Sequence, residues 1–439
     1  MIFEEFCSIL EELLYKVHSR INTKNNGFKI CIAVSGGIDS MALLALTHKW
    51  QKVNYPNFKI YAVTIDHNLR SNSANDTLFV NDFCNKKEIY HKTLVWNHSG
   101  IKTGIQEKAR KARYKLIHQF CKENHIDIIL TAHHFDDNLE QLLMSISRGS
   151  DISSYIIPDI RSYGTCNILR PLMKFEKYQL ENFLEFNNIA WAHDESNDEE
   201  KYLRNKIRPI ASLLKNISEI SRIKTTFKKI KLYKECNAEI VDKEIQNSAQ
   251  IKFGYIKLDL SRFFAVNYNI QISILKSLLQ TVGIRNKEIR LNSLDNLLQK
   301  MKEKASSTLC GTQLFYHNNT AILLREFAKD KAELKKLDKN LFLWDKKYEI
   351  FINFNEFKDC YDNIQIRTLT ANELNNLIKD FPNLLEFDIS LSRFIKKRIV
   401  KSIPCVVSLE KVLAIPHIYY YDESIKDLVK FTYHKTNKK

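Results

Sequence analysis

Paired cysteines are absent from this sequence. Its nine cysteines, among 439 residues, are scattered along the chain, and no two of them form a CxxC. Zinc ribbons and thioredoxin-type redox sites are built from such pairs, so the sequence encodes neither of them locally. In a reducing compartment, the scattered cysteines are best interpreted as small buried apolar side chains.

Long apolar segments are absent too. No apolar run reaches the roughly 20 residues that a helix needs to cross a bilayer, and residues 1–24 lack the basic head, apolar middle and cleavage site of a secretory leader. We therefore expect a cytoplasmic protein with no membrane partner. The sequence contains no internal repeat, and nothing in it predicts a stable protein partner.

What the chain has in excess is positive charge. Its formal net charge is +16, which favours a polyanionic partner such as nucleic acid or an anionic membrane surface. A lysine-rich genome would produce the same excess without a partner. The contents of hydrophobic residues, 44%, and of charged residues, 27%, are typical of a globular protein. At ~150 residues per domain, the length suggests roughly three domains.

The stretch from Lys29 to Leu46 reads KICIAVSGGIDSMALLAL. Residues 30–34 form an unbroken apolar run, the pattern of a strand that is covered on both faces. The run ends at Ser35, Gly36 and Gly37, where glycine permits a sharp turn, and residues 41–46 are good helix formers. The pattern predicts a strand, a glycine turn and a helix.

Such a turn directs free backbone N–H groups and the positive end of a helix at one point, which favours phosphate. The GxxxxGK[ST] loop is absent and no lysine follows the glycines. Instead Asp39 stands in the turn, where a carboxylate would repel phosphate unless a divalent cation joined them. We therefore expect Asp39 to help hold Mg²⁺. The alternative is that Asp39 and Ser40 merely cap the helix.

Further strands are predicted over residues 59–65, 89–95 and 126–132, with helices between them. This alternation up to about residue 210 predicts an α/β fold with a doubly wound parallel sheet. Polar residues at the carboxyl ends of buried strands are candidates for a site. Asp66 and Arg70 follow the second strand, although they are equally consistent with the start of a solvated loop.

The fourth predicted strand is followed by HHFDDNLE, residues 133–140. If a helix begins near Asp136, then Asp136 and Glu140 lie four residues apart on one face, and Asp137 and Glu140 lie three apart. Three carboxylates beside a strand end suit a bound cation, either a metal or an ammonium group. An acidic first turn favoured by the helix dipole is the structural alternative. His133 and His134 are adjacent and cannot easily reach one ion together.

Basic residues recur at helical spacing, which places them on common faces. These sets are Arg110 with Arg113, Arg204 with Arg208, and Lys224 with Lys228 and Lys231. Each set could meet phosphates, and each could equally form a solvated face or surface ion pairs. We expect a catalytic domain over residues 1–215, a mostly helical domain over 216–330, a charge-rich linker near 329–339 and a small α+β domain over 341–439.

Eight motifs in a fixed order carry a resemblance to a known family. They are SGGIDS (35–40), DHNLR (66–70), QEKARKARY (106–114), AHHFDDNLEQ (132–141), SRG (147–149), RPL (170–172), DESN (194–197) and RNKIR (204–208). The set resembles the tRNA(Ile)-lysidine synthases, which belong to the PP-loop ATP pyrophosphatases with a Rossmann-like fold. Asn138 departs from the glutamine usual in that family.

The resemblance implies ATP- and Mg²⁺-dependent joining of L-lysine to cytidine 34 in the CAU anticodon of tRNA(Ile), through an adenylated base, with release of AMP and pyrophosphate. The implied ATP-binding residues are Ser35, Gly36, Gly37, Ile38, Asp39, Ser40, Asp66 and His133. The implied catalytic residues are Asp39, Arg113, Asp137 and Glu140. Substrate or tRNA contacts are expected from Asp136, Arg204, Arg208, Lys224, Lys228 and Lys231.

Two other functions stay open at this point. A PP-loop sulfur transferase acting on tRNA would use the same loop, but the lack of paired cysteines disfavours it. A non-catalytic tRNA-binding protein could retain the fold as a scaffold, yet carboxylates at 39, 136, 137 and 140 would hinder RNA binding unless they served chemistry.

Overall fold

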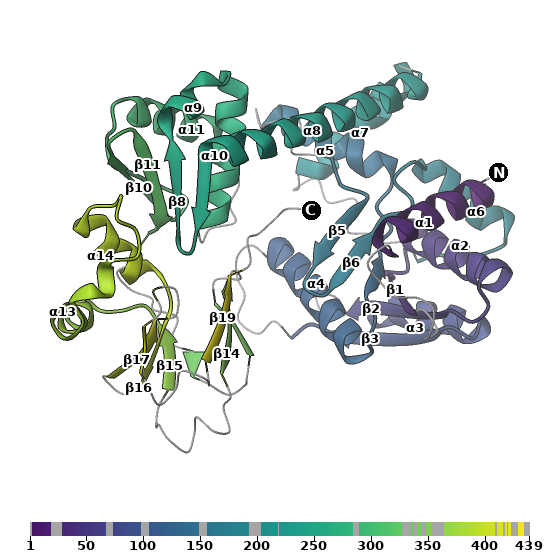
Figure 1. Ribbon diagram of the computed structural model, residues 1–439. Helices are drawn as coiled ribbons and strands as arrows, with labels where there is room; N and C mark the ends of the chain where they lie inside the picture. The colour runs from purple at the N-terminus through teal and green to yellow at the C-terminus, as the bar shows by residue number, and fades with distance from the viewer. Residues whose placement is uncertain are drawn as a thin grey trace. The chain divides into compact units, whose positions relative to one another are not determined.

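In a computed structural model, the chain divides into two compact units, Met1–Lys231 and Leu232–Lys439 (Figure 1). The structure describes residues 2–18, 29–66, 73–97, 105–148, 156–192, 203–217, 219–283, 289–326, 335–336, 341–344, 348–352, 364–408, 411–415, 418, 420–422 and 429–433. Each unit has apolar clusters of its own, so each is described separately. No helix in these described ranges is long and apolar enough to cross a bilayer.

The first unit is built on a six-stranded sheet of order β3-β2-β1-β4-β6-β5. Its strands are β1 (Lys29–Ala33), β2 (Lys59–Asp66), β3 (Tyr90–Val95), β4 (Ile128–Leu130), β6 (Cys166–Leu169) and β5 (Ile160–Tyr163). The neighbours from β3 to β6 run parallel, and β5 pairs antiparallel with β6. The predicted doubly wound parallel sheet is confirmed.

Helices cover both faces of this sheet because its central strands are apolar on both sides. The larger core joins α1 (Ile2–His18), α2 (Ile38–Asn54), α3 (Ser73–Lys86) and α6 (Lys177–Phe186) to one face. On the other face, α4 (Ile105–Glu123) packs Ile117, Phe120 and Cys121 against the strands. Figure 1 shows α4 on the side of the sheet away from α1 and α2. The central strand β1 is thereby enclosed, as its unbroken apolar run predicts.

The fourth strand is shorter than its apolar run. A strand is expected over 126–132, and β4 is Ile128–Leu130. Backbone pairing nevertheless extends past both ends, since Asn167 N donates to Asp127 O at 2.7 Å and Thr131 N donates to Leu169 O at 3.1 Å. The following helix, α5 (Phe135–Ser147), begins one residue before the expected Asp136.

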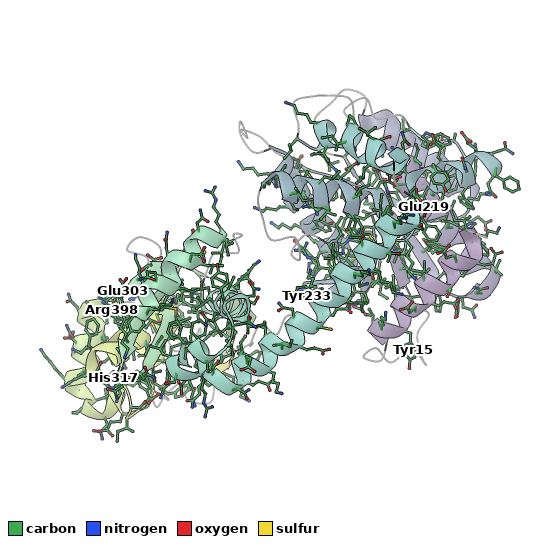
Figure 2. All side chains as sticks on the ribbon, turned by 90° about the horizontal axis from the view of Figure 1, so that it is seen from above. Tyr15, Glu219, Tyr233, Glu303, His317 and Arg398 are labelled. Carbon is green, nitrogen blue, oxygen red and sulfur yellow. The ribbon has the colours of Figure 1, made fainter. Side chains whose placement is uncertain are left out.

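Two further helices follow the sheet. The first, α7 (Leu203–Ile217), packs Ala211 against Phe135 and Leu139 of α5. The second, α8 (Ile220–Ser248), adds Phe227 to the same cluster. Figure 2 shows Glu219 just before the first turn of α8 and Tyr233 about halfway along it. Lys224, Lys228 and Lys231 therefore lie on one long helix, as their spacing predicts.

The second unit contains three antiparallel sheets. The first has the order β7-β8-β11-β10-β9 and is covered by α9 (Leu260–Ala265), α10 (Tyr268–Val282) and α11 (Leu291–Lys302). Its strands are β7 (Ala249–Lys252), β8 (Tyr255–Asp259), β9 (Ser307–Leu309), β10 (Thr312–His317) and β11 (Thr320–Arg325). The sequences of β10 and β11 have the apolar character of strands. β7 and β8 are joined by a short turn at Gly254, φ 77°, and are too short to be recognised as strands from the sequence.

The other two sheets form the rest of this unit. One has the order β12-β15-β16-β17-β18 and the other β13-β14-β19. Their strands are β12 (Lys335–Lys336), β13 (Leu341–Trp344), β14 (Tyr348–Ile352), β15 (Ile364–Arg367), β16 (Cys405–Ser408), β17 (Lys411–Ile415), β18 (Tyr420–Tyr421) and β19 (Val429–Tyr433). Helices α13 (Ala371–Asp380) and α14 (Arg393–Ser402) and the 3₁₀ turn η3 (Pro382–Leu385) accompany them. β12 lies inside the expected linker and pairs with β15; the boundaries of the later domains stay predictions.

Candidate functional site

The candidate site lies where the strand order of the sheet reverses. From β1 the chain proceeds outward to β2 and β3, whereas β4 lies on the other side of β1 and leads to β6. The loops after β1 and β4 therefore open next to each other, at the position where open α/β sheets bind ligands. Contact between them is direct, since Nε2 of His134 lies 3.4 Å from Oδ1 of Asp39.

Glycine is required at one position of the loop after β1. Gly36 has φ 90°, a left-handed conformation that other residues adopt at a cost. Its carbonyl accepts a hydrogen bond from Ala192 N at 2.9 Å, which fixes the turn. Gly37 has an ordinary φ of −72° and is the N-cap of α2. Among the residues that the structure describes, a side chain there would meet only Ser35 Oγ, at 3.9 Å, so these residues leave space beside Gly37.

The two serines of this loop have different environments. Ser40 is buried, its hydroxyl accepts a hydrogen bond from Ser35 N at 3.1 Å, and it donates to Gly37 O at 3.0 Å. Ser35 is exposed, and its Oγ lies 3.2 Å from that of Ser40. Because no side chain caps the N-terminus of α2, the capping alternative for Asp39 and Ser40 finds no support. The first N–H groups of α2 are thus left for an anion.

Asp39 combines a charge with an unsatisfied atom. Its side chain is one-third exposed, and its buried Oδ1 has no hydrogen-bond partner in the described part of the chain; His134 is within ion-pair distance only. A carboxylate oxygen with no donor is a ligand that suits Mg²⁺. The described residues contain no group of three acidic, histidine or cysteine side chains that could hold a metal. Asp39 would therefore need oxygen ligands from a bound phosphate and from water.

His134 is the centre of the acidic cluster. It is 6% exposed, with Nδ1 3.4 Å from Asp136 Oδ2 and Nε2 3.7 Å from Asp137 Oδ2. Burial alone lowers the pKa of His134, but contacts with Asp136, Asp39 and Asp137 outweigh it and raise that pKa to about 10. The imidazole is a cation at neutral pH, and it holds three carboxylates together.

The adjacent His133 has the opposite character. Its Nδ1 lies 3.1 Å from Thr131 Oγ1. Burial lowers the pKa of His133 to about 4; Asp137 opposes this change, and Arg170, Arg110 and Arg204 add to it. Of the pair, the family resemblance implies His133 for ATP, yet His134 is the histidine that lies against Asp39.

Asp137 and Glu140 share one partner. Arg204 donates to Asp137 Oδ1 through Nη2 and to Glu140 Oε2 through Nε. Arg208 lies on the same face of α7, and its Nε donates to Glu140 Oε1 at 3.1 Å. Asp137 Oδ2 also accepts a hydrogen bond from His134 N at 3.0 Å. The cation that these carboxylates hold in this structure is therefore a guanidinium of the chain itself.

Comparison with known proteins places this chain in a family. A model of the PP-loop domain matches residues 10–214. The tRNA(Ile)-lysidine synthase of Rickettsia bellii (strain RML369-C) is 32% identical over 421 residues, which cover 94% of this chain and 96% of that protein. The tRNA(Ile)-lysidine synthase of Orientia tsutsugamushi (strain Boryong) is 32% identical over 418 residues, 92% of either chain. The chain belongs to the tRNA(Ile)-lysidine synthase family.

As a member of the tRNA(Ile)-lysidine synthase family, the chain is an enzyme with an ATP-binding PP-loop domain. Among solved structures, the U34-tRNA thiolase NcsA of Methanococcus maripaludis with its 4Fe–4S cluster has a TM-score of 0.42 at 16% identity, and covers 53% of this chain and 79% of its own. That likeness is too low to bear on the function of this family member.

In this family member, two residues of the site, Lys215 and Glu176, were not predicted from the sequence. Lys215 of α7 donates to Asp136 Oδ1 at 2.5 Å, and its Nζ lies 3.7 Å from Oε2 of the buried Glu176. Asp136 thus has a basic partner of its own in Lys215, although it shares His134 with Asp137, and no single cation in the described part of the chain contacts Asp136, Asp137 and Glu140 together. Lys215 stands eleven residues after Arg204, on the same helical face, and this spacing is the signal that could have found it.

The predicted lysine stripe on α8 is partly engaged within the first unit. Lys224 Nζ lies 3.0 Å from Glu176 Oε1, and Lys231 Nζ lies 2.5 Å from Asp159 Oδ2. Lys228 is exposed and has no ion-pair partner among the residues that the structure describes. Of these three lysines, Lys228 alone is therefore a fully available positive charge.

Three further predicted residues lie on described elements of the first unit. Asp66 is the last residue of β2, half-buried, and its carbonyl accepts a hydrogen bond from Trp96 N at 2.9 Å. Arg113 is exposed on α4, and Ile38 is half-buried at the start of α2. Arg70 and the DESN motif over 194–197 lie outside the described residues.

A separate cavity of about 350 Å³ lies at the other edge of the sheet. Its lining includes His48 and Lys52 of α2, Lys59 at the start of β2 and Tyr90 at the start of β3. These are the amino ends of the strands, so this cavity is not part of the site at their carboxyl ends.

Proposed function

We propose that this enzyme converts cytidine 34 in the CAU anticodon of tRNA(Ile) to lysidine, using ATP, Mg²⁺ and free L-lysine. The observation that carries the proposal is the contact between the glycine loop and the acidic cluster, made by Asp39 and His134 at 3.4 Å. This contact supports a phosphate site on the glycine turn with carboxylates for an amine substrate beside it. A sequence identity of 32% to a named lysidine synthase, over 94% of the chain, supports tRNA(Ile) and lysine as the substrates.

ATP would bind with its phosphates on the loop after β1. The uncapped N-terminus of α2 supplies N–H donors, and the open space at Gly37 lets a phosphate approach the backbone. Mg²⁺, held by Asp39, would neutralise phosphate charge and orient the leaving pyrophosphate. Arg113, exposed on α4, is the proposed side-chain donor to charge that develops on the phosphates.

The reaction has two steps. The C2 oxygen of cytidine attacks the α-phosphorus of ATP, forming the adenylated base and releasing pyrophosphate. The ε-amine of lysine then attacks C2, the C2–N bond forms, and the C2–O bond breaks to release AMP. The attacking nitrogen must lose protons, since an ammonium with a pKa near 10.4 is a poor nucleophile. A carboxylate of the cluster is the proposed acceptor of a proton.

Asp137 and Glu140 are the proposed binding groups for the lysine ammonium. Burial raises the pKa of Asp137, but His134 and Arg204 outweigh it and lower that pKa, so the carboxylate is charged at neutral pH. In this structure Arg204 bridges Asp137 and Glu140. A lysine substrate would therefore share these carboxylates with Arg204 or displace it.

The tRNA would present its anticodon as a single strand. An unpaired base can be turned into a pocket without melting a duplex. The net charge of +16 favours the RNA backbone, and the later part of the chain would select the tRNA mainly through backbone contacts. Asp136, Arg208 and the exposed Lys228 are further proposed contacts for substrate or tRNA.

The test is an incorporation assay with the full chain. Purified protein is given ATP, Mg²⁺, radiolabelled lysine and a CAU-anticodon tRNA(Ile), and both tRNA label and nucleotide products are measured. We expect label in tRNA in equal amount to AMP. A tRNA(Met) with the same anticodon serves as the control and should remain unlabelled. Absence of label, or ADP as the nucleotide product, would contradict the proposal.

A further inference from the structure

Arg170 is a buried arginine at the edge of the proposed ATP site. It directly follows β6, and the parallel register that pairs Leu130 with Leu169 continues to place it level with Thr131. Thr131 N donates to Leu169 O, and Thr131 Oγ1 contacts His133. The side chain of Arg170 is only 2% exposed. A permanent positive charge is therefore enclosed one strand away from the loop that ends in His134.

Among the described residues, the polar contacts of this guanidinium are to neutral groups. Nη1 donates to Pro158 O at 2.6 Å, and the side chain is hydrogen-bonded to the Tyr114 hydroxyl of α4. Its buried Nε has no hydrogen-bond partner, and no carboxylate in the described part of the chain lies within ion-pair distance of it. Burial of an unpaired charge is strongly unfavourable, so its retention calls for an anion that this structure does not contain.

The charge of Arg170 acts on the site side of the sheet. Burial and the charges of Arg170, Arg110 and Arg204 lower the pKa of His133, whereas Asp137 raises it, so Arg170 lies close enough to act on the loop after β4. Arg110 is also close to Tyr114, with its Cζ 6.0 Å from the ring centroid. Arg170, Tyr114 and Arg110 thus form a basic group on the α4 face, close to His133.

We propose that Arg170 is a positioning residue for the triphosphate of ATP. Its fixed charge attracts the phosphates from beneath the strand ends, and its hydrogen bonds hold Tyr114 and the segment before β5 in place around them. A preorganised charge of this kind needs no reorganisation when the nucleotide binds. The inference rests on the proposed function, because that function supplies the anion.

The test compares variants that keep or remove the charge. Arg170→Gln can still donate to Pro158 O but is neutral, whereas Arg170→Lys stays charged. We expect Arg170→Gln to raise the Kd for Mg-ATP and the KM for ATP by about tenfold, with the KM for lysine unchanged. Arg170→Lys should change them by less than about threefold. Affinity for adenosine, which carries no phosphate, should be the same in all variants.

Two further variants separate positioning from folding. Arg161 is exposed on β5 and its charge is near that of Arg170, so Arg161→Gln is the matched control, with ATP binding unaltered. If Arg170→Gln does not fold, Tyr114→Phe removes one partner of the guanidinium while keeping the ring contact with Tyr163. It should raise the KM for ATP about threefold at an unchanged unfolding temperature.

The outcomes are distinct. If the wild-type protein does not bind Mg-ATP, the proposed function fails. If it binds Mg-ATP and folded Arg170→Gln binds it equally well, only the role of Arg170 fails. A lower unfolding temperature with an unchanged KM for ATP would also overturn that role and make Arg170 a purely structural residue.

Discussion

Asp39 is the residue whose surroundings allow the most direct test of its proposed function. Its Oδ1 has no hydrogen-bond partner among the described residues, while Oδ1 also lies 3.4 Å from the charged His134. We expect Asp39→Asn to lower the rate of lysine incorporation by about 100-fold or more, because a neutral amide is a poor Mg²⁺ ligand. Binding of tRNA should change little. Turnover and filter-binding assays measure the two effects separately.

The control for Asp39 is Asp82→Asn, since Asp82 is exposed on α3. It should leave both turnover and tRNA binding unchanged. A parallel loss of turnover and of tRNA affinity in Asp39→Asn would contradict the place of Asp39 at the phosphates.

Individual site residues were predictable to the extent that their chemistry is local. The glycine turn, Asp39 and the carboxylates Asp137 and Glu140 follow from the order of strand, loop and helix. Their partners do not, since Arg204 contacts residues 64 and 67 positions earlier in the chain. Sequence spacing places Arg204 on a helical face, but only the packing of α7 on α5 shows that this face meets carboxylates rather than phosphate.

At the scale of the element, the glycine turn offers a paired test. Gly36→Ala would force a side chain into φ 90° and should cost about 1–2 kcal/mol of unfolding free energy. Gly37→Ala, at φ −72° with open space, should leave stability within about 0.5 kcal/mol. It should instead weaken Mg-ATP binding, because the new methyl group occupies the space that a phosphate would enter.

Chemical denaturation and Mg-ATP titration of the two variants check this separation. Equal destabilisation by both substitutions would show that the turn is constrained at Gly37 as well. If Gly37→Ala leaves the affinity for ATP unaltered, the phosphate does not bind on that side of the loop.

Helix α13 gives a prediction about pH. Glu373 accepts hydrogen bonds from Arg367 Nη1 and Thr370 N, both at 2.8 Å. Burial raises the pKa of Glu373, but these donors outweigh it and lower that pKa below its ordinary value of 4.5. The stabilisation is therefore complete above pH 4.5 and is lost as the pH falls through the lowered pKa.

We expect Glu373→Gln to destabilise the protein by about 1–3 kcal/mol at neutral pH. The difference from wild type should shrink as the pH falls below 4.5, since the wild-type carboxylate then becomes protonated as well. Thermal unfolding of both proteins over this pH range measures it. Glu386→Gln, at an exposed position, is the control, and a difference that is constant with pH would rule out the ion pair as its cause.

The elements themselves were predictable where hydrophobic periodicity is strong. β1, β2 and β4 follow from apolar runs, because a parallel sheet buries both faces of its inner strands, whereas the edge strand β3 has no buried residue. The short strands β7, β8 and β12 could not be found this way. Their pairing partners, rather than their composition, make them strands, as the pairing of Lys335 and Lys336 with β15 shows.

At the scale of the whole molecule, the net charge of +16 divides into charges used within the chain and charges left for a partner. Lys224 and Lys231 neutralise Glu176 and Asp159, and Lys228 between them is exposed. We expect Lys228→Ala to weaken tRNA binding and to reduce the slope of log K against log salt by up to about one, the value for one phosphate contact. Lys231→Ala, on the same face, should change the slope less, because the charge of Lys231 is already paired with Asp159 and is less available to a phosphate.

Lys224→Ala should act on stability instead. It leaves Glu176, which is 3% exposed, with one basic partner fewer, and should cost about 1–3 kcal/mol of unfolding free energy. Titrations with tRNA at several salt concentrations and denaturation curves separate the two effects. If all three alanine variants reduce the slope equally, the ion pairs open when RNA binds, and the stripe acts as one surface. If none does, the RNA backbone lies elsewhere and the excess charge on α8 serves only to hold the helix on the first unit.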